Sequence, residues 1–279
     1  MIKYNDVAVN IEIFPNGESR IIIPNISPFR QNIELIYESD ADLIHLMMVK
    51  KHLENNLYGS LKKSNNFNLT MKYVPYSRMD RVKNSDFVFT LKYAMEFINS
   101  LGFDQVTILE PHSDVAPALI NNVFVSSPIK ELFKVACLEQ KFDPDKDYIY
   151  FPDATAKKRQ EDNFKNYENI LYGIKHRDFK TGDITGLEIQ GNFKNIKLDS
   201  KVFMIDDLTS YGGTFVFGDI ELKKLGFAES FLIVAHAEKS CFEKKLFDHI
   251  EKLYTTNSII QEKDIPEELK ERVKILDRE

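Results

Sequence analysis

One continuous stretch, residues 202–215, constrains the fold more than any other part of the chain. It opens with the apolar run Val202–Ile205, reaches two adjacent carboxylates at Asp206 and Asp207, crosses a polar turn with paired glycines, and becomes apolar again. An apolar run of strand-forming residues that ends in such a turn predicts a strand, then a loop, then a helix. The stretch therefore predicts an α/β fold with this strand buried in a parallel sheet.

The polar residues of this stretch have a pattern suited to a sugar phosphate. Asp206 and Asp207 lie at the carboxyl end of the predicted strand, the usual ligand edge of an open α/β sheet, where carboxylates can accept hydrogen bonds from vicinal hydroxyls. Gly212 and Gly213 let the backbone approach a ligand, and we expect Thr214 to cap the next helix, whose amides then face an anion. The alternative is a plain strand-to-helix turn.

Composition excludes several classes of protein. The 279 residues favour one or two domains, and 37 Lys and Arg against 43 Asp and Glu disfavour general binding to nucleic acid or to an anionic membrane. Cys137 and Cys241 have no metal-ligand or disulfide spacing. No stretch is apolar enough to span a bilayer, and the N-terminus lacks a signal-peptide pattern. We expect a protein of the bacterial cytoplasm or of the cytoplasm of a phage-infected cell.

Two further segments near the N-terminus carry candidate ligand-binding residues. The alternating residues 1–24 predict a hairpin that turns at Pro15-Asn16-Gly17, which an ordinary Asn-Gly turn explains in full. A strand that ends near Pro75 runs into Arg78-Met79-Asp80-Arg81, whose guanidiniums can pair with polyphosphate oxygens. A surface ion network is the alternative for these charges.

Two later strands also end in polar residues. The strand at residues 105–109 leads to His112 between two acids, Glu110 and Asp114, which suits either a magnesium-phosphate site or an ordinary loop histidine. The strand at residues 147–151 delivers Pro152-Asp153, and we expect Asp153 to contact magnesium or ribose. Farther along, we expect an edge strand at residues 188–193 and a helix at residues 239–250.

Taken in order, these segments resemble the phosphoribosyl pyrophosphate (PRPP) synthetase family, the ribose-phosphate diphosphokinases. The family's Phe-x-Asp-Gly-Glu, Pro-Tyr-x-Arg-Gln-Asp-Arg, Asp-Leu-His-x-x-Gln, Ser-Pro-Asp and Asp-Asp-x-x-Asp-Thr-Gly-Gly-Thr segments have counterparts between Phe14 and Leu276. The resemblance implies two similar domains of the type I phosphoribosyltransferase fold, each a mainly parallel sheet flanked by helices. Residues 1–128 would form the ATP side and residues 129–279 the ribose-phosphate side, with the last residues returning to the first domain.

The resemblance also implies roles for individual residues. The ATP-binding residues would be Phe14, Asn16, Glu18, Arg78, Asp80 and Arg81. The ribose phosphate would bind Asp206, Asp207, Thr209, Ser210, Tyr211, Gly212, Gly213 and Thr214. His112 and Asp153 would help to place Mg²⁺, and the catalytic residues would be His112 with Lys175 and Arg177 of a mobile loop. Apart from the resemblance, a Lys-x-Arg pair is a common solvated feature.

The implied reaction moves the β,γ-diphosphoryl group of ATP to the anomeric hydroxyl of a ribose 5-phosphate moiety and releases AMP. Mg²⁺ is the implied cofactor, ATP the co-substrate, and a homo-oligomer, at least a dimer, the implied assembly. No nucleic acid or membrane partner is expected. The rival functions are a phosphoribosyltransferase, which would consume PRPP, and a non-catalytic regulatory protein.

The chain departs from the family at the phosphate loop, and this bears on the acceptor. Ser210 and Tyr211 stand where the family has Asp and Thr, and Asn16 and Met79 replace an Asp and a Gln elsewhere. A phenol could border a larger group on the 5-position. Phage and bacterial relatives of this branch include enzymes that pyrophosphorylate ADP-ribose in NAD salvage. We therefore expect ADP-ribose as the acceptor, with ribose 5-phosphate as the alternative.

Overall fold

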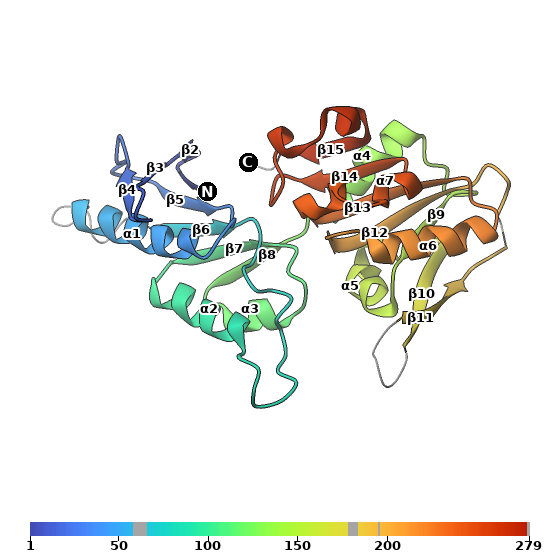
Figure 1. Cartoon of the computed structure of the whole chain (residues 1–279), viewed down its shortest axis with the longest axis horizontal. Helices are drawn as coiled ribbons and strands as arrows, with labels where there is room; N and C mark the ends of the chain where they lie inside the picture. The colour runs from blue at the N-terminus through green and yellow to red at the C-terminus, as the bar shows by residue number, and fades with distance from the viewer. Residues whose placement is uncertain (58–65, 178–183, 195, 278–279) are drawn as a thin grey trace. The chain divides into compact units, whose positions relative to one another are not determined.

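The structure of the chain is a computed structural model, which describes residues 1–57, 66–177, 184–194 and 196–277, with the side chains of 175–177 and 184–185 left out. The chain forms two compact units (Figure 1). The first is Met1–Ser126, and the second begins at Ser127. Each unit has its own sheet and its own buried apolar core, so each is described by itself.

The first unit contains a six-stranded sheet in the order β2-β1-β5-β6-β7-β8. Its strands are β1 (Ile2–Tyr4), β2 (Val7–Ala8), β5 (Gln31–Leu35), β6 (Phe67–Met71), β7 (Gln105–Leu109) and β8 (Val123–Ser126). The last four run parallel to one another, while β1 is antiparallel to both β2 and β5. A separate hairpin of β3 (Asn10–Ile13) and β4 (Ser19–Ile22) confirms the predicted turn.

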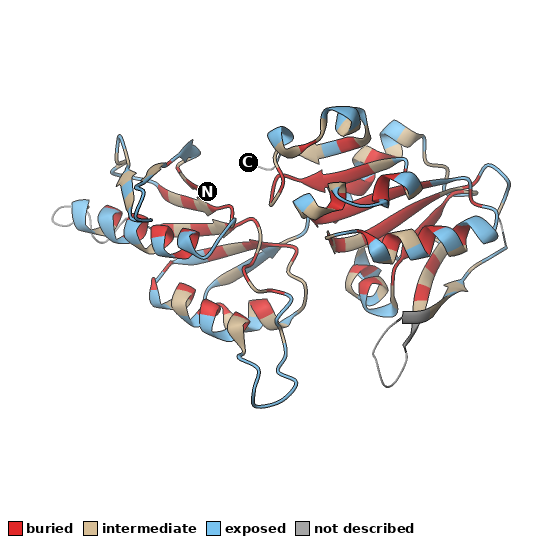
Figure 2. Ribbon diagram, in the orientation of Figure 1, coloured by how far each residue is buried: buried red, intermediate tan, exposed pale blue. Residues whose placement is uncertain are grey.

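Helices of the first unit bury their apolar positions against this sheet. They are α1 (Ala41–Asn56), α2 (Thr90–Ser100) and α3 (Val115–Leu119). Leu46 of α1 and Met95 of α2 are fully buried in the same cluster as Ile33, Leu69 and Ile108 of the strands. This periodic burial of one helix face, seen in red in Figure 2, is what an amphipathic helix against a sheet requires.

The second unit contains a seven-stranded sheet in the order β11-β10-β9-β12-β13-β14-β15. Its strands are β9 (Tyr148–Phe151), β10 (Ile170–Arg177), β11 (Ile184–Gly191), β12 (Lys201–Thr209), β13 (Glu229–Ala237), β14 (Lys252–Thr256) and β15 (Val273–Leu276). All pair in parallel except β11, which is antiparallel to β10. The predicted strand of residues 202–205 is thus the central strand of this sheet.

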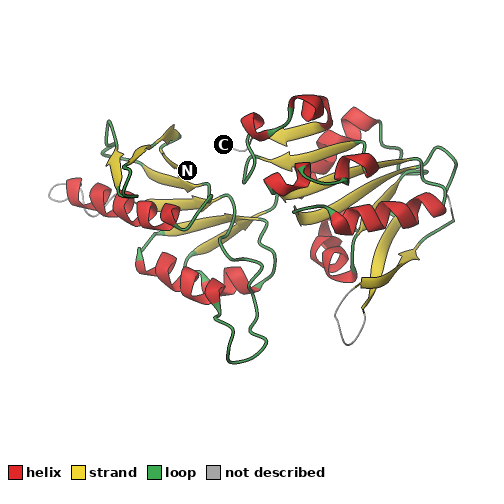
Figure 3. Ribbon diagram, in the orientation of Figure 1, coloured by secondary structure: helices red, strands yellow, loops and turns green. Residues whose placement is uncertain are grey.

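Helices alternate with the strands of the second unit (Figure 3). They are α4 (Ile129–Gln140), α5 (Ala154–Phe164), α6 (Gly213–Lys224) and α7 (Leu246–His249), with 3₁₀ turns η1 (Lys239–Phe242), η2 (Glu262–Asp264) and η3 (Glu267–Arg272). Successive β12 residues belong to different apolar clusters: Val202 and Met204 pack in the cluster of α6, and Phe203 and Ile205 in that of α4. Because both faces of β12 are covered, its sequence is a continuous apolar run.

The predicted α/β fold with mainly parallel, helix-flanked sheets is confirmed, and several details differ. The expected helix at residues 239–250 is interrupted, since it forms η1 and α7 with a break between them. The expected edge strand begins earlier, at Ile184. The strand β15 pairs with β14 in the second unit, and the return of the last residues to the first domain stays a prediction. Among the described helices, none combines the length and the apolar character needed to cross a membrane.

Burial makes both cysteines poor nucleophiles. Desolvation raises the pKa of Cys137 to about 12, with Asp147 adding to the effect, and desolvation likewise raises the pKa of Cys241 to about 12. A thiol with a raised pKa stays protonated at neutral pH and reacts slowly. We expect iodoacetamide to leave both thiols unmodified in the folded protein and to alkylate both after unfolding in guanidinium chloride, as counted by intact mass. Rapid alkylation of folded protein would contradict this environment.

Candidate functional site

The carboxyl edge of the second sheet is where β12 delivers its polar residues. The parallel register sets Asp206 opposite Val234 and Thr209 opposite Ala237 of β13, while the other side of β12 pairs with β9. The carboxyl ends of parallel strands meet at one edge, where open α/β sheets bind ligands. The acids therefore lie where the sequence predicts them.

A single guanidinium joins the two carboxylates. Nη2 of Arg159, in α5, lies 2.9 Å from Oδ1 of Asp206 and 2.9 Å from Oδ1 of Asp207. The backbone N–H of Asp207 also donates to Oδ1 of Asp206 at 2.9 Å. Burial, followed by the neighbouring charge of Asp207, raises the pKa of Asp206 well above its usual range, while Arg159 opposes that shift. Two acidic side chains thus share a poorly hydrated site in which the positive charge of Arg159 favours the ionised form of Asp206.

Asp153 begins α5 and has a clear structural role. As the N-cap residue, it accepts the backbone N–H of Ala156 on Oδ1 at 2.9 Å. This bond satisfies one of the open amides of the first helical turn. Its predicted contact with magnesium or ribose stays a proposal.

The phosphate loop differs from the prediction at its cap. Gly212, and not Thr214, is the N-cap of α6, with a φ of +76°. This left-handed conformation favours glycine because a Cβ would be strained there. Thr214 lies inside the first turn, and the carbonyl of Gly212 accepts the N–H groups of Phe215 and Val216, each at 3.0 Å. The first amides of α6 nevertheless face the carboxyl edge of β12, which is the arrangement that favours an anion.

Residues 238–244, which follow β13, contact successive residues of the phosphate loop, Thr209–Tyr211. The N–H of Glu238 donates to the carbonyl of Thr209 at 2.9 Å, and the hydroxyls of Ser210 and Ser240 lie 3.1 Å apart. Nζ of Lys244 lies 4.3 Å from the centre of the Tyr211 ring, which is 46% exposed. The loop therefore has little freedom to rearrange independently of residues 238–246.

Lys175 and Arg177 lie within β10 by their backbone, which pairs with β11 as far as Arg177. The expectation that they belong to a mobile loop stays a prediction. Their side chains lie outside the described part of the chain, so their catalytic roles stay proposals.

In the first unit, three of the predicted ATP-binding residues and the predicted metal residue His112 follow two neighbouring strands. Arg78, Asp80 and Arg81 come after β6, and His112 comes after β7; the pairing of Met71 with Ile108 brings the two strand ends to the same edge. Nε of the exposed Arg81 lies 3.5 Å from Oδ1 of Asp80. The charge pair foreseen as an alternative is therefore present, although only its arginine is exposed.

A carboxylate from α1 fixes the start of this loop. Tyr76 has a φ of +61°, which is unusual for a residue with a side chain, and its hydroxyl donates to Oδ1 of Asp40. The same oxygen accepts the hydroxyl of Tyr37 at 2.6 Å. These two bonds lower the pKa of Asp40. The backbone that leads to Arg78 is thereby held in a strained conformation at the ligand edge.

The predicted adenine-binding residues form their own hairpin tip. Nδ2 of Asn16 donates to Oε2 of Glu18 at 2.9 Å, and the N–H of Phe14 donates to the carbonyl of Glu18 at 2.8 Å. Phe14 is 44% exposed. The hairpin is tied to α1 by a 2.7 Å contact between Oγ of Ser19 and Nε2 of His45. The described contacts do not bring Phe14 to Arg78 or His112.

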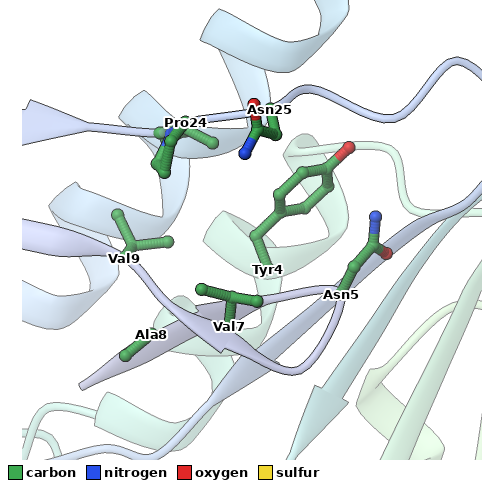
Figure 4. A pocket seen from close by; sticks show the side chains of 8 residues that line it. Tyr4, Asn5, Val7, Ala8, Val9, Pro24 and Asn25 are labelled. Carbon is green, nitrogen blue, oxygen red and sulfur yellow. The ribbon is translucent and has the colours of Figure 1, made fainter.

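A cavity of about 110 Å³ in the first unit lies apart from all of these residues (Figure 4). It is lined by residues of the β1–β2 turn and of the segment after β4, among them Tyr4, Val7 and Pro24. The Tyr4 hydroxyl donates to Oε1 of Gln31 at 2.8 Å and accepts the N–H of Ser27 at 3.0 Å. Because none of the predicted site residues lines this cavity, it plays no part in the site.

Comparison with known proteins finds relatives that match most of the chain. No family model matches the chain. A ribose-phosphate pyrophosphokinase of Pyrococcus furiosus is 27% identical over 269 residues, which cover 92% of this chain and 89% of the relative. The enzyme of the same name from Sulfolobus acidocaldarius is 24% identical over 92% of this chain and 86% of its own length. The chain is therefore similar to ribose-phosphate pyrophosphokinases, the PRPP synthetases, over most of its length.

The fold of the PRPP synthetase family is present throughout the chain. The crystal structure of phosphoribosylpyrophosphate synthetase from Mycobacterium smegmatis has a TM-score of 0.72 at 15% identity and covers 98% of this chain and 87% of its own. The predicted two domains of the phosphoribosyltransferase type are therefore confirmed as a fold. As a PRPP synthetase relative, the protein is an enzyme of the diphosphotransferase class.

Sequence reasoning missed Arg159 in this PRPP synthetase relative. The residue stands at the end of the segment that begins with Pro152-Asp153, and only its position six residues after the cap hints at its role. With Asp153 as the cap, α5 turns Ala156, Gln160 and Phe164 inward, and Arg159 next to them reaches the acids. If Asp153 is recognised in the sequence as a helix N-cap, the helical spacing that follows places Arg159 beside the buried face of α5.

Two neighbouring glycines of the loop provide a matched test. A Cβ at Gly212 would lie 2.8 Å from Cδ1 of Leu246 in a left-handed conformation, whereas a Cβ at Gly213 would meet no atom within 4 Å. We expect Gly212→Ala to lower the free energy of unfolding by about 1–3 kcal/mol. Gly213→Ala should change it by less than about 1 kcal/mol. Denaturant unfolding measures both, and equal effects would refute the described backbone of the loop.

Proposed function

We propose that the protein is a ribose-phosphate pyrophosphokinase that transfers the β,γ-diphosphoryl group of ATP to the anomeric hydroxyl of ribose 5-phosphate. The observation that carries this proposal is the pair Asp206–Asp207 at the sheet edge, followed within the same loop by the N-terminus of α6. Carboxylates accept from the ribose hydroxyls, and helix amides bind the 5-phosphate. The curated relatives, all named ribose-phosphate pyrophosphokinase, support the same acceptor.

In this proposal the second unit holds the acceptor and the first unit holds the nucleotide. Asp206 and Asp207 bind the ribose hydroxyls, while Thr209, Ser210, Tyr211, Gly212, Gly213 and Thr214 surround the 5-phosphate. Phe14, Asn16 and Glu18 bind the adenine, and Arg78, Asp80 and Arg81 bind the polyphosphate. Guanidinium groups suit phosphate oxygens because they can donate two parallel hydrogen bonds.

The donor atoms of the chain suit magnesium that arrives on the nucleotide. In the part of the chain that the structure describes, no three His, Cys, Asp or Glu side chains gather to hold a metal ion. Mg²⁺ is commonly bound through one or two protein groups together with substrate phosphates and waters. His112 and Asp153 are the residues proposed to contact it. When bound, the cation neutralises charge on the phosphates.

The proposed chemistry depends on positioning and on charge neutralisation. A bond forms between the anomeric oxygen and the β-phosphorus, the bond from that phosphorus to the bridging oxygen breaks, and AMP leaves with the bridging oxygen. The hydroxyl proton passes to solvent. Phosphoryl transfers of this kind need little covalent help from the protein. Lys175 and Arg177 are proposed to offset the negative charge that develops on the transferred group.

The acceptor preferred here differs from the one expected from the sequence. The relatives support ribose 5-phosphate, and none of them supports ADP-ribose. One observation keeps ADP-ribose as a second candidate: Tyr211 exposes its ring beside Lys244 at the phosphate loop. An aromatic face and an ammonium group could border an acceptor with a larger anionic 5-substituent. We also propose at least a dimer, in which the exposed Phe14 hairpin of one copy completes the adenine site of the other.

Measurement of AMP release with each acceptor distinguishes the two candidate functions. With magnesium-ATP, we expect AMP and PRPP from ribose 5-phosphate and slower or no turnover with ADP-ribose, as followed by mass spectrometry of the products. Asp206→Asn should raise the KM for the acceptor roughly tenfold or more, because it removes a charged hydrogen-bond acceptor. Turnover with ADP-ribose alone would favour the second candidate. Silence with both acceptors would point to a regulatory protein or a phosphoribosyltransferase.

The proposed role of Lys175 has its own test. Lys175→Ala should lower kcat about 100-fold or more, because the lost charge acts on the transferred group. The Kd for ATP, measured by calorimetry, should change far less. Lys165, on the exposed surface after α5, provides a control: Lys165→Ala should leave both values unchanged. An unaltered kcat in Lys175→Ala would remove this residue from the mechanism.

A further inference from the structure

Arg159 is built into the acid pair more firmly than a surface arginine would be. Its side chain is 20% exposed, and those of Asp206 and Asp207 are 15% and 5% exposed. One nitrogen, Nη2, contacts both carboxylates at 2.9 Å. Charged groups so far removed from water need partners, and the loss of one partner is costly. The three side chains are therefore one electrostatic unit.

The helix that carries Arg159 is anchored at its start and along its inner face. Asp153 caps it through the N–H of Ala156, and Ala156, Gln160 and Phe164 are buried. Phe164 packs edge-on against Phe133 and Phe151. Because α5 is fixed in this way, the guanidinium of Arg159 lies in a defined position next to β12.

We propose that Arg159 is the internal counter-ion of Asp206 and Asp207, which reserves the pair for the acceptor's hydroxyls and keeps a divalent cation out of it. The inference rests on the proposed function for the identity of the acceptor. Its electrostatic part concerns only the three side chains.

Charge explains why the pair with Arg159 is suited to hydroxyls. Two ionised carboxylates carry a charge of about −2, which attracts a divalent cation, but the guanidinium reduces the total to about −1. The bond to Nη2 uses one acceptor position on each carboxylate, and the N–H of Asp207 uses a second one on Asp206. A neutral diol needs acceptor atoms and not net charge, whereas Mg²⁺ needs charge and several oxygen ligands.

The position of the guanidinium points the same way. Nη2 lies 2.9 Å from Oδ1 of each acid, so it occupies the position that a cation bridging these two oxygens would take. Across the described residues, no third acid or histidine joins the pair to complete a metal site. Arg159 is thus a positioning residue: it acts on the acceptor through the two carboxylates.

The test combines metal binding with steady-state kinetics. Mn²⁺ binding to the nucleotide-free protein is measured by electron paramagnetic resonance for wild type, Arg159→Gln and Arg159→Gln/Asp207→Asn. The matched control is Lys158→Gln, which removes an exposed positive charge from the same helix. Arg159→Lys, which keeps the charge, serves as the conservative variant, and thermal unfolding shows whether each variant is folded.

We expect Arg159→Gln to bind Mn²⁺ roughly tenfold more tightly than wild type, and the added Asp207→Asn to abolish that gain. The KM for the acceptor should rise roughly tenfold in Arg159→Gln, recover in part in Arg159→Lys, and stay at the wild-type value in Lys158→Gln. The KM for ATP should be unchanged in all of them.

Two results would overturn the inference. One is an unchanged affinity for Mn²⁺ in folded Arg159→Gln. The other is a large fall in kcat with an unchanged acceptor KM, which would place Arg159 on the transferred group. Failure of the proposed function is seen separately, because wild type would then release no AMP with either acceptor while the Mn²⁺ measurement still decides the counter-ion role.

Discussion

The parallel pairing of β12 with β9 on one side and β13 on the other is the constraint on which the second unit depends. Alternate residues of Val202–Ile205 pack into the two apolar clusters on opposite faces of the sheet. A shift of β12 by one residue would therefore exchange the side chains of its two faces. That fixed register delivers Asp206–Thr209 to the carboxyl edge, and the same edge receives α5 and α6. The site is thus a consequence of how the core packs.

The fixed register of β12 places the carboxylates of Asp206 and Asp207 beside each other in a poorly hydrated position, where two negative charges repel. Arg159 offsets this repulsion with one nitrogen shared between both acids. A contrasting case is Asp219 of α6, fully buried and surrounded by Ser230, Lys223 and His249 at 2.6–2.8 Å. That carboxylate is enclosed by its own unit and stabilises packing. The acid pair lies instead at the carboxyl end of β12, the edge at which open α/β sheets bind ligands.

The sequence predicts the features that local patterns encode and misses those that depend on tertiary contacts. The apolar run of β12, its two acids and the hairpin at Asn16 follow from periodicity and turn chemistry. The cap at Gly212 was missed because the close approach of Leu246, which leaves no room for a Cβ there, is a contact between residues distant in the sequence. Arg159 was missed because the strongly charged helix α5 has no clear apolar stripe. Residues 239–250 form no single helix, and Ser240, Lys244 and Leu246 of this segment contact the phosphate loop.

The contacts of the phosphate loop with residues 238–246 give different explanations for Ser210 and Tyr211, the two residues of this loop that depart from the family pattern. The hydroxyl of Ser210 lies 3.1 Å from that of Ser240, which in turn lies 3.4 Å from Oε2 of Glu238. The aspartate that the family has at position 210 would here approach the carboxylate of Glu238, and two like charges so close repel. Ser210 is therefore explained by its own neighbours, whatever the acceptor is. Tyr211 has no such explanation: it faces solvent beside Lys244, so it alone still bears on the choice of acceptor.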